Sequence, residues 1–113
     1  MTSAFERLEL LLGPDTLPRL TKARVVIAGL GAVGAAAAES LVRSAIGHFV
    51  LVDFDEIRAT NLNRHPFAFH STLGQPKAET AARFLRDINP DAEIIPRSIF
   101  LDAKTAPKLF ADH

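Results

Sequence analysis

Several polar side chains follow directly on an apolar run in the middle of the chain. After the run HFVLV come two carboxylates, two amides and a guanidinium, at Asp53, Asp55, Asn61, Asn63 and Arg64. An acidic side chain at the end of a strand can accept hydrogen bonds from ribose hydroxyls. An arginine presents a planar fork of donors that suits phosphate oxygens. Because loops aimed by a rigid scaffold often carry function, we interpret this segment as part of a binding site rather than as a solvated turn.

A glycine-rich turn, GLGAVG at residues 29–34, precedes this segment and has the pattern G-x-G-x-x-G. It follows an apolar run and opens an alanine-rich stretch, which is the strand–turn–helix context that the pattern requires. Glycine lets backbone amides approach a phosphate, and a helix start adds free N–H donors and a favourable dipole. Asp53 follows this turn by 19 residues, at the end of the next expected strand. We therefore predict that a nucleotide contacts Gly29, Gly31, Ala32 and Gly34. The alternative is a tight turn with close helix–strand packing and no ligand.

Lys77 lies in the first turn of another expected helix. A cation at that position opposes the helix dipole by a few tenths to about 1 kcal/mol, and a bound anion would reverse the effect. Together with Asn61 and Arg64, we expect Lys77 to donate to a polyphosphate, because clustered donors are typical of phosphate sites. The alternative is a surface lysine that pairs with Asp87 or Glu79.

Few other side chains have a spacing that suits a metal or a base. Asp55 could bind Mg²⁺ through water, because magnesium prefers carboxylates combined with phosphates. His65 and His70 are five residues apart in an expected loop, and without a carboxylate partner they do not predict a metal site. We predict no other metal site in this chain. Phe67 and Phe69 could stack on a base, but we expect them to pack against apolar side chains.

The composition is that of an ordinary globular protein. The chain has 113 residues, of which 48% are hydrophobic and 23% charged, and its formal net charge is zero. This length fits one domain or part of a larger one, and the charge balance gives no general attraction to nucleic acid or to a membrane. The lack of cysteine excludes disulfides, thiol catalysis and a four-cysteine zinc site. With no segment like a signal peptide or a membrane span, we expect a cytoplasmic protein that does not bind membranes.

Hydrophobic periodicity and the positions of glycine and proline predict alternating helices and strands. The expected elements, in chain order, are helices at 4–12 and 17–21, a strand at 24–29, a helix at 31–47, a strand at 48–55, a helix at 76–88, an edge strand at 92–100 and a helix from 105. In the helix at 31–47, Val33, Ala37, Leu41 and Ser44 share a face. This order predicts an α/β fold, the first, nucleotide-binding half of a Rossmann-like doubly wound sheet, mostly parallel and with strand order 3-2-1.

We divide the chain into a helical N-terminal segment, residues 1–22, and a strand–helix–strand nucleotide-binding half, residues 23–113. The strand at 25–28 would be central in a complete doubly wound sheet. With nothing beyond it, an apolar edge would face water, which favours unwanted pairing. We therefore expect that the natural protein continues past His113 or that another chain covers this edge.

Four stretches of the sequence, GLGAVG, LVDFDEIRATNLNRH, LGQPKAE and INP, together resemble the adenylating enzymes of the ThiF/MoeB/HesA superfamily, which includes ubiquitin-activating enzymes. The resemblance covers nearly the whole chain. Its combination of D-x-D, N-L-N-R and a lysine 13 residues after the arginine is much more specific than the glycine turn alone. It implies that residues 1–113 are the N-terminal part of an adenylation domain that binds ATP and Mg²⁺, activates a carboxylate as an acyl-adenylate and releases pyrophosphate.

The resemblance also implies roles for individual residues. Asp53 would hold the ribose, while Asn61, Arg64 and Lys77 would contact phosphates. Arg7 matches an arginine that reaches the partner's ATP in homodimers of the superfamily, so a homodimer is implied. The catalytic residues would then be Arg64, Lys77 and Arg7.

This chain departs from the superfamily pattern in three places. His65 stands where a glutamine follows N-L-N-R, and Gly31–Ala32 stands for a second pair of glycines. The metal-binding aspartate of the superfamily would fall beyond His113. By itself, the 113-residue chain is expected to bind nucleotide weakly and not to turn over.

Within the superfamily, the segments RLELLLGPDTLPRLTKARV and NLNRHPFAFHSTLGQPKAE most resemble the tRNA threonylcarbamoyladenosine dehydratases. The substrate would then be the carboxylate of threonylcarbamoyladenosine in tRNA, which is cyclised. A second interpretation is adenylation of the C-terminus of a small ubiquitin-like sulfur carrier. An inactive partner subunit is disfavoured because Arg64 and Lys77 are both present. An NAD-dependent dehydrogenase would explain the glycines and Asp53 but not the polar segment after them.

Overall fold

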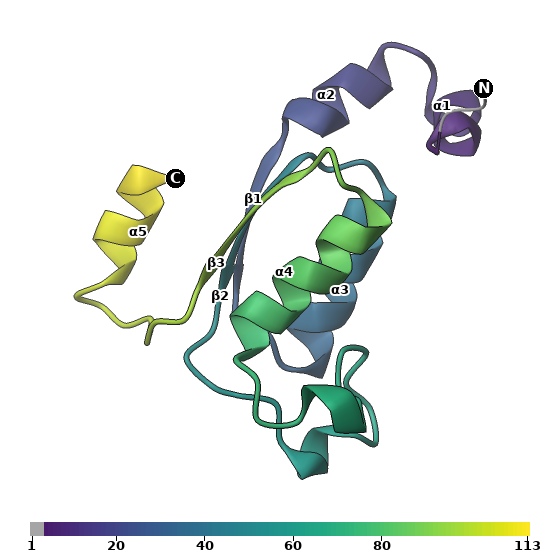
Figure 1. Ribbon diagram of the computed structural model, residues 1–113. Helices are drawn as coiled ribbons and strands as arrows, with labels where there is room; N and C mark the ends of the chain where they lie inside the picture. Colours follow the sequence, from purple (N-terminus) through teal and green to yellow (C-terminus); the bar gives the residue numbers. More distant parts are fainter. Residues whose placement is uncertain (1–3) are drawn as a thin grey trace.

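The centre of the molecule is a three-stranded parallel sheet (Figure 1), seen in a computed structural model that describes residues 4–113. The strands are β1 (Arg24–Ala28), β2 (His48–Val52) and β3 (Glu93–Arg97), and they lie in the order β1-β2-β3. Both neighbouring pairs run parallel. The predicted fold class, the first half of a Rossmann-like sheet with order 3-2-1, is confirmed.

The register aligns the carboxyl ends of the three strands. Ala28 lies opposite Val52, and Val52 lies opposite Arg97. One further bond extends the ladder on each side of β2, from Gly29 N–H to the Val52 carbonyl at 2.8 Å and from Asp53 N–H to the Arg97 carbonyl at 3.1 Å. The glycine turn and the polar segment therefore both leave the sheet at the carboxyl ends of the strands, which is where ligands bind in open α/β sheets.

Two long helices, α3 (Ala32–Arg43) and α4 (Lys77–Ile88), cover one face of the sheet (Figure 1). Side chains of β2 alternate between the two faces. Phe49 and Leu51 join the main core with residues of α3 and α4, while Val50 and Val52 point to the other face, where they pack with Leu109 of α5 (Ala106–Asp112). The main core therefore lies between the sheet and the α3–α4 layer.

The buried face of α3 differs from the face that periodicity suggested. Val33 is 86% exposed, and the buried residues of the helix are Ala35, Ala38 and Val42. An alanine-rich helix offers small residues on every face, so periodicity does not select one. The glycine turn determines which face is buried, because a Cβ at Gly34 would lie 2.0 Å from the carbonyl oxygen of Gly29. Since glycine has no Cβ, the Gly34 side of the helix can pack closely on the turn.

Strand β1 is less buried than its apolar sequence suggested. Its residues Val25, Val26 and Ile27 are only partly buried, because within residues 4–113 the strand pairs with β2 alone. The expected apolar edge is therefore present. Strand β3 is the opposite edge, where Pro96 lies across from Leu51, as expected for a proline that cannot donate to a ladder.

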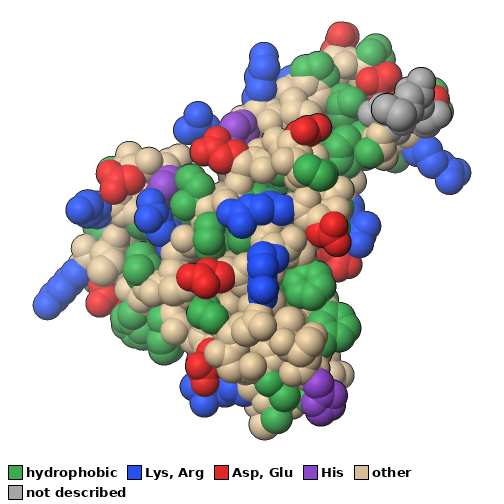
Figure 2. Space-filling view, in the orientation of Figure 1, with side chains coloured by type: hydrophobic (Ala, Val, Ile, Leu, Met, Phe, Trp, Pro, Cys, Tyr) green, Lys and Arg blue, Asp and Glu red, His purple; other side chains and the backbone are tan. Residues whose placement is uncertain are grey.

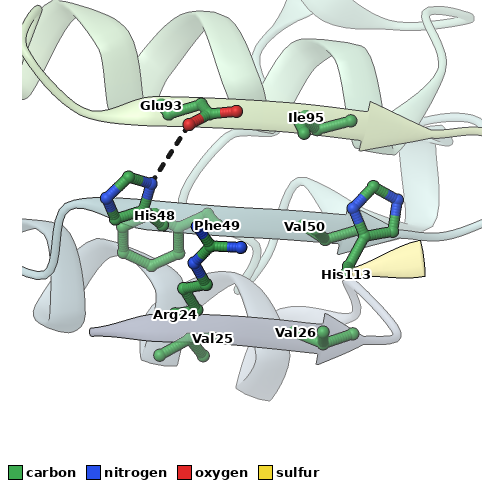
Figure 3. Close-up of a pocket in the computed structure, with 9 residues that line it drawn as sticks. All are labelled: Arg24, Val25, Val26, His48, Phe49, Val50, Glu93, Ile95 and His113. Atoms are coloured by element: carbon green, nitrogen blue, oxygen red, sulfur yellow. Dashed lines mark hydrogen bonds and ion pairs between the residues drawn. The ribbon is translucent and has the colours of Figure 1, made fainter. Parts of the chain in front are cut away.

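The sheet face opposite α3 and α4 packs against Leu109 of α5 and carries a recess at the amino ends of the strands (Figure 3). Val26, Val50 and Ile95 form its floor, and His113 lies over it. Nδ1 of His48 lies 3.1 Å from Oε2 of Glu93 at its rim. Parallel sheets are usually covered on both faces, so a recess on one face is unusual. This recess lies at the amino ends of the strands, away from the predicted site at their carboxyl ends.

The remaining elements lie outside the sheet. Helices α1 (Glu6–Leu12) and α2 (Thr16–Lys22) have no buried residue, and α1 lies beyond the amino ends of the strands (Figure 1). Two short 3₁₀ helices, η1 (Ala59–Asn61) and η2 (His70–Thr72), lie in the loop before α4. The division of the chain at residue 22 stays a prediction. Among the described residues, no helix is long and apolar enough to cross a membrane.

Charges of both signs are mixed on the face that α4 presents to the viewer (Figure 2). The exposed charged residues of α4 include Glu79, Arg83, Arg86 and Asp87. This face therefore has no broad surface of one sign, in agreement with the zero net charge of the chain.

Candidate functional site

The glycines of the turn have two different surroundings: Gly34 is needed for close packing, and the space above Gly31 is open. Gly29 has a φ of +98°, a conformation that side chains disfavour. Gly34 must lack a side chain because of the Gly29 carbonyl. A Cβ at Gly31, in contrast, would meet nothing within 4 Å, and Gly31 precedes the free first-turn amides of α3. The packing explanation thus accounts for Gly34 but leaves the surface at Gly31 available to a ligand.

Two alanine substitutions should separate these roles. Gly34→Ala is expected to lower the free energy of unfolding by about 2 kcal/mol, because the new methyl overlaps a backbone oxygen. Gly31→Ala is expected to fold normally, since its φ of −67° suits alanine, and to weaken ATP binding about tenfold by obstructing the amides. Thermal denaturation and ATP titration measure the two effects. A destabilised Gly31→Ala, or a fully stable Gly34→Ala, would contradict this assignment.

Asp53 connects the end of β2 to the glycine turn. Its Oδ2 accepts the N–H of Leu30 at 2.7 Å, and its Oδ1 accepts the N–H of Asp55 at 2.8 Å. Charge-assisted bonds of this kind are stronger than neutral ones. Each oxygen keeps a second lone-pair direction, so the carboxylate can orient the turn and still accept from a ligand hydroxyl.

A short antiparallel contact brings Lys77 to the polar segment. Glu56 pairs with Pro76, and the N–H of Lys77 donates to the carbonyl of Asp55 at 3.0 Å. Lys77 is the first residue of α4, and its side chain is only 10% exposed. Within residues 4–113 its one ion pair joins Nζ to Oδ2 of Asp55 at 4.0 Å. Lys77 is therefore not a surface lysine, and a mostly buried cation stands at the positive end of a helix.

Asp55 lies between two cations. Its Oδ1 accepts from Nη2 of Arg58 at 2.9 Å and from Nε of Arg58 at 3.2 Å. The Arg58 hydrogen bond, followed by one from the backbone of Glu56, holds the pKa of the Asp55 carboxyl below its ordinary value of 3.8. Since the folded-state pKa is depressed, the stability from these contacts is present at neutral pH and is lost as the pH falls below that value. Sequence reasoning missed Arg58.

Asn61 and Arg64 lie on one tight turn. Oδ1 of Asn61 accepts the N–H of Arg58 at 2.9 Å, which leaves its amide nitrogen free to donate. Arg64 is exposed, and its Nη1 donates to the carbonyl of Thr60 at 3.0 Å and to Oδ1 of Asn63 at 2.7 Å. Within residues 4–113, no contact joins Arg64 to Lys77. The structure brings Lys77 to Asp55 but leaves Arg64 on a neighbouring exposed turn.

An apolar recess that sequence reasoning missed adjoins Asp53. Gly29, Phe54, Ile99 and Phe100 are among its lining residues. Phe54 and Phe100 are 63% and 59% exposed, and their ring centroids lie 5.0 Å apart in an edge-to-face arrangement. Exposed aromatic side chains are surfaces on which nucleobases stack. The position of Phe54, between two aspartates just after a buried strand, was the available signal.

Phe67, Phe69 and His65 make packing contacts beside the site. Phe67 is 2% exposed and stacks on Phe84, with centroids 5.0 Å apart, and Phe69 also stacks on Phe84. The predicted packing role is confirmed for Phe67, while Phe69 contacts Phe84 but stays 48% exposed. His65 is 6% exposed and lies against Leu30 of the glycine turn. Within the described residues, no three His, Asp or Glu side chains are grouped to hold a metal.

Arg7 does not join this site. It is an exposed residue of α1, which lies beyond the amino ends of the strands, whereas the site lies at their carboxyl ends (Figure 1). A role for Arg7 at a nucleotide would therefore require the site of another copy.

Fold and site together define a Rossmann-like half-sheet with a glycine turn, an aspartate bonded to that turn and a mostly buried lysine at the start of α4. The chain belongs to the ThiF family, whose pattern it matches over residues 5–113.

Individual relatives agree with this assignment. The chain is 40% identical over 110 residues to tRNA threonylcarbamoyladenosine dehydratase of Bacillus subtilis, covering 97% of this chain and 43% of that protein. It is 39% identical over 99 residues to molybdopterin-synthase adenylyltransferase of Escherichia coli, covering 88% and 40%. The crystal structure of E. coli TcdA, a tRNA N6-threonylcarbamoyladenosine dehydratase in complex with ATP, matches with a TM-score of 0.94 and 31% identity over 97% of this chain and 45% of that one. The chain thus spans less than half the length of these relatives.

Proposed function

We propose that the protein binds ATP at the carboxyl edge of the sheet and uses it to adenylate a carboxylate. The observation that carries the proposal is Lys77, a mostly buried cation at the start of α4, beside Asp55 of the polar segment. A cation at that end of a helix is unfavourable unless an anion accompanies it. One carboxylate, Asp55, lies 4.0 Å away and is already bonded to Arg58. A polyphosphate would supply the missing negative charge.

The residues at the carboxyl ends of the strands match the parts of ATP. The recess with Phe54 and Phe100 suits a purine, and Asp53 at its side suits ribose hydroxyls. The amides at the start of α3 suit phosphates. Asn61, Arg64 and Lys77 are proposed to donate to the phosphates as well. The structure of E. coli TcdA in complex with ATP supports the proposal.

The reaction would be an in-line displacement at the α-phosphorus. A carboxylate oxygen of the substrate forms a bond to the α-phosphorus, and the bond from that phosphorus to the bridging oxygen of the β-phosphate breaks. Pyrophosphate leaves with the bond's electron pair. The protein need not supply a nucleophile, because positioning and charge stabilisation are the main requirements. Lys77 and Arg64 would stabilise the charge that develops on the phosphates.

Asp55 does not fit a magnesium site. Both of its oxygens face cations, at Arg58 and Lys77, and the described residues group no three acidic or histidine side chains around a common point. We propose Mg²⁺ as the counterion of ATP, but we assign it no ligand in this chain.

The proposed acceptor is threonylcarbamoyladenosine in tRNA, because the B. subtilis relative is a dehydratase of that nucleoside. The second candidate is a small ubiquitin-like carrier protein, favoured by the molybdopterin-synthase adenylyltransferase and by a SAMP-activating enzyme E1 of Haloferax volcanii at 36% identity. A homodimer is also proposed, because α1, which carries Arg7, lies beyond the amino ends of the strands (Figure 1), so the implied role of Arg7 at a nucleotide needs the site of a second copy.

The test is ATP–pyrophosphate exchange by the full-length protein, with and without tRNA that carries threonylcarbamoyladenosine. We expect exchange that requires this tRNA and falls about 100-fold in Arg64→Ala, because a phosphate donor is lost. Arg43→Ala is the control, as Arg43 is an exposed residue of α3 paired with Glu39. Exchange only with a small carrier protein would favour the second candidate. NAD binding without any exchange would contradict the proposal.

A further inference from the structure

His65 is a buried titratable side chain to which the proposed chemistry gives no role. It is 6% exposed and contributes no ion pair within residues 4–113. Its ring contacts two backbone groups from separate parts of the chain. Nε2 lies 2.7 Å from the carbonyl oxygen of Leu30, in the glycine turn, and Nδ1 lies 3.1 Å from the backbone nitrogen of Phe67.

These two contacts assign the proton on the ring. The N–H of Phe67 can only donate, so Nδ1 must accept. The Leu30 carbonyl can only accept, so Nε2 must carry the proton and donate. The ring of His65 is therefore assigned as the Nε2–H tautomer, in which each ring nitrogen has a hydrogen bond to a backbone group. Each partner is itself buried, Leu30 at 0% and Phe67 at 2% exposure, so neither group has water as a substitute.

The carbonyl of Leu30 is the last backbone group before the phosphate-facing part of the turn. The N–H of the same residue is held by Asp53 at 2.7 Å, so His65 and Asp53 together hold both polar groups of Leu30. Gly31, with the open space above it, comes next.

The other side of His65 is the turn that carries Asn61 and Arg64. The backbone N–H groups of Arg64 and His65 both donate to the carbonyl of Asn61, at 3.2 and 2.9 Å. Arg64 is thus the immediate neighbour of a ring that is buried against the glycine turn. The two sets of candidate phosphate donors, the amides at the start of α3 and the Asn61–Arg64 turn, belong to different loops, and the His65–Leu30 hydrogen bond joins these loops.

We infer that His65 is a positioning residue that sets the distance between the glycine-turn amides and the Asn61–Arg64 turn, so that both reach one triphosphate. This inference rests on the proposed ATP site. It predicts a specific deficit: loss of the His65–Leu30 bond should weaken the binding of the phosphates more than the binding of the nucleoside.

The variants follow from the reach of each side chain. In asparagine the amide group lies where Nδ1 lies in histidine, so His65→Asn keeps an acceptor for Phe67 and loses the donor to Leu30. In glutamine the amide nitrogen reaches as far as Nε2, so His65→Gln keeps a donor to Leu30 and also carries an acceptor. Thr72→Val is the control for loop stability, because the Thr72 hydroxyl donates to the Phe67 carbonyl at 2.8 Å and accepts from Phe69 N–H.

The experiment measures the dissociation constants of ATP and adenosine by calorimetry on the full-length protein, together with its thermal stability. We expect His65→Asn to lose about tenfold in ATP affinity, the equivalent of one buried hydrogen bond, with adenosine affinity unchanged within about twofold. His65→Gln should restore most of the loss. Thr72→Val should lower thermal stability and leave the ratio of the two constants unchanged.

Two results would overturn the inference. If His65→Asn and Thr72→Val change ATP and adenosine affinity alike, His65 has only a structural role, while ATP binding by the wild type would still support the proposed function. If the wild type binds no ATP at all, the proposed function fails and the positioning role fails with it.

Discussion

Lys77→Met is expected to reduce ATP–pyrophosphate exchange about 100-fold or more, the usual cost of removing a charge-stabilising donor. The same change should leave the nucleotide-free protein as stable as the wild type, or more stable by up to about 1 kcal/mol, because it removes a cation from the positive end of a helix. Methionine keeps the length and apolar stem of lysine, so the mostly buried position stays filled. In Lys77→Met the Asp55 carboxylate keeps its hydrogen bond from Arg58.

Lys108→Met is the matched control, because Lys108 is an exposed lysine of α5 and should change neither exchange nor stability. Exchange assays and thermal denaturation of the full-length variants give the two readouts. A purely structural Lys77 would lower stability on substitution. Loss of activity together with loss of stability would therefore contradict a phosphate-binding role.

Asp53→Asn is expected to have the largest combined effect. The wild-type carboxylate accepts two backbone N–H groups, from Leu30 and Asp55. An asparagine can accept one and must direct its NH₂ at the other, so we expect a loss of about 2 kcal/mol in the free energy of unfolding. Because Asp53 is proposed to hold the ribose, adenosine and ATP affinity should fall together, by about tenfold. This pattern differs from the one expected for His65→Asn, which spares adenosine.

Asp102→Asn provides the comparison for this prediction. Oδ1 of Asp102 also accepts two backbone N–H groups, from Lys104 and Thr105, in the turn between the recess residue Leu101 and α5. These bonds lower the pKa of the Asp102 carboxyl, so the carboxylate is the form that the fold uses there too. Because both bonds at Asp102 end on one oxygen, the amide oxygen of Asp102→Asn can keep both, so this variant measures the loss of charge alone. Asp53→Asn must lose one of its two bonds and should therefore be destabilised more, which denaturation and calorimetry of both variants measure. Equal nucleotide affinity in Asp53→Asn and wild type would contradict the ribose assignment.

Much of the fold was predictable because its signals are local. The apolar runs at β1 and β2, the glycine turn between β1 and α3, and the proline before α4 each predicted their element within a few residues. Strand order followed from the usual arrangement of the first half of a doubly wound sheet and needed no knowledge of side-chain contacts. The face of α3 could not be predicted, because its alanines are alike on every side and the Gly29–Gly34 contact alone selects the packed one.

The candidate site divides in the same way. The sequence motifs carried the resemblance to the ThiF family, which the family match over residues 5–113 confirms. Residue type and spacing predicted the chemistry of the donors and the proximity of the glycine turn to Asp53, because adjacent parallel strands end at one side of the sheet. Only the tertiary structure decided that Lys77 is buried beside Asp55, that Arg58 bonds that same carboxylate, that Phe54 meets Phe100 and that His65 holds Leu30. These contacts join residues whose partners are selected by the path of the loops between elements. That path depends on which backbone groups find hydrogen-bond partners in the folded chain, and no local pattern specifies it.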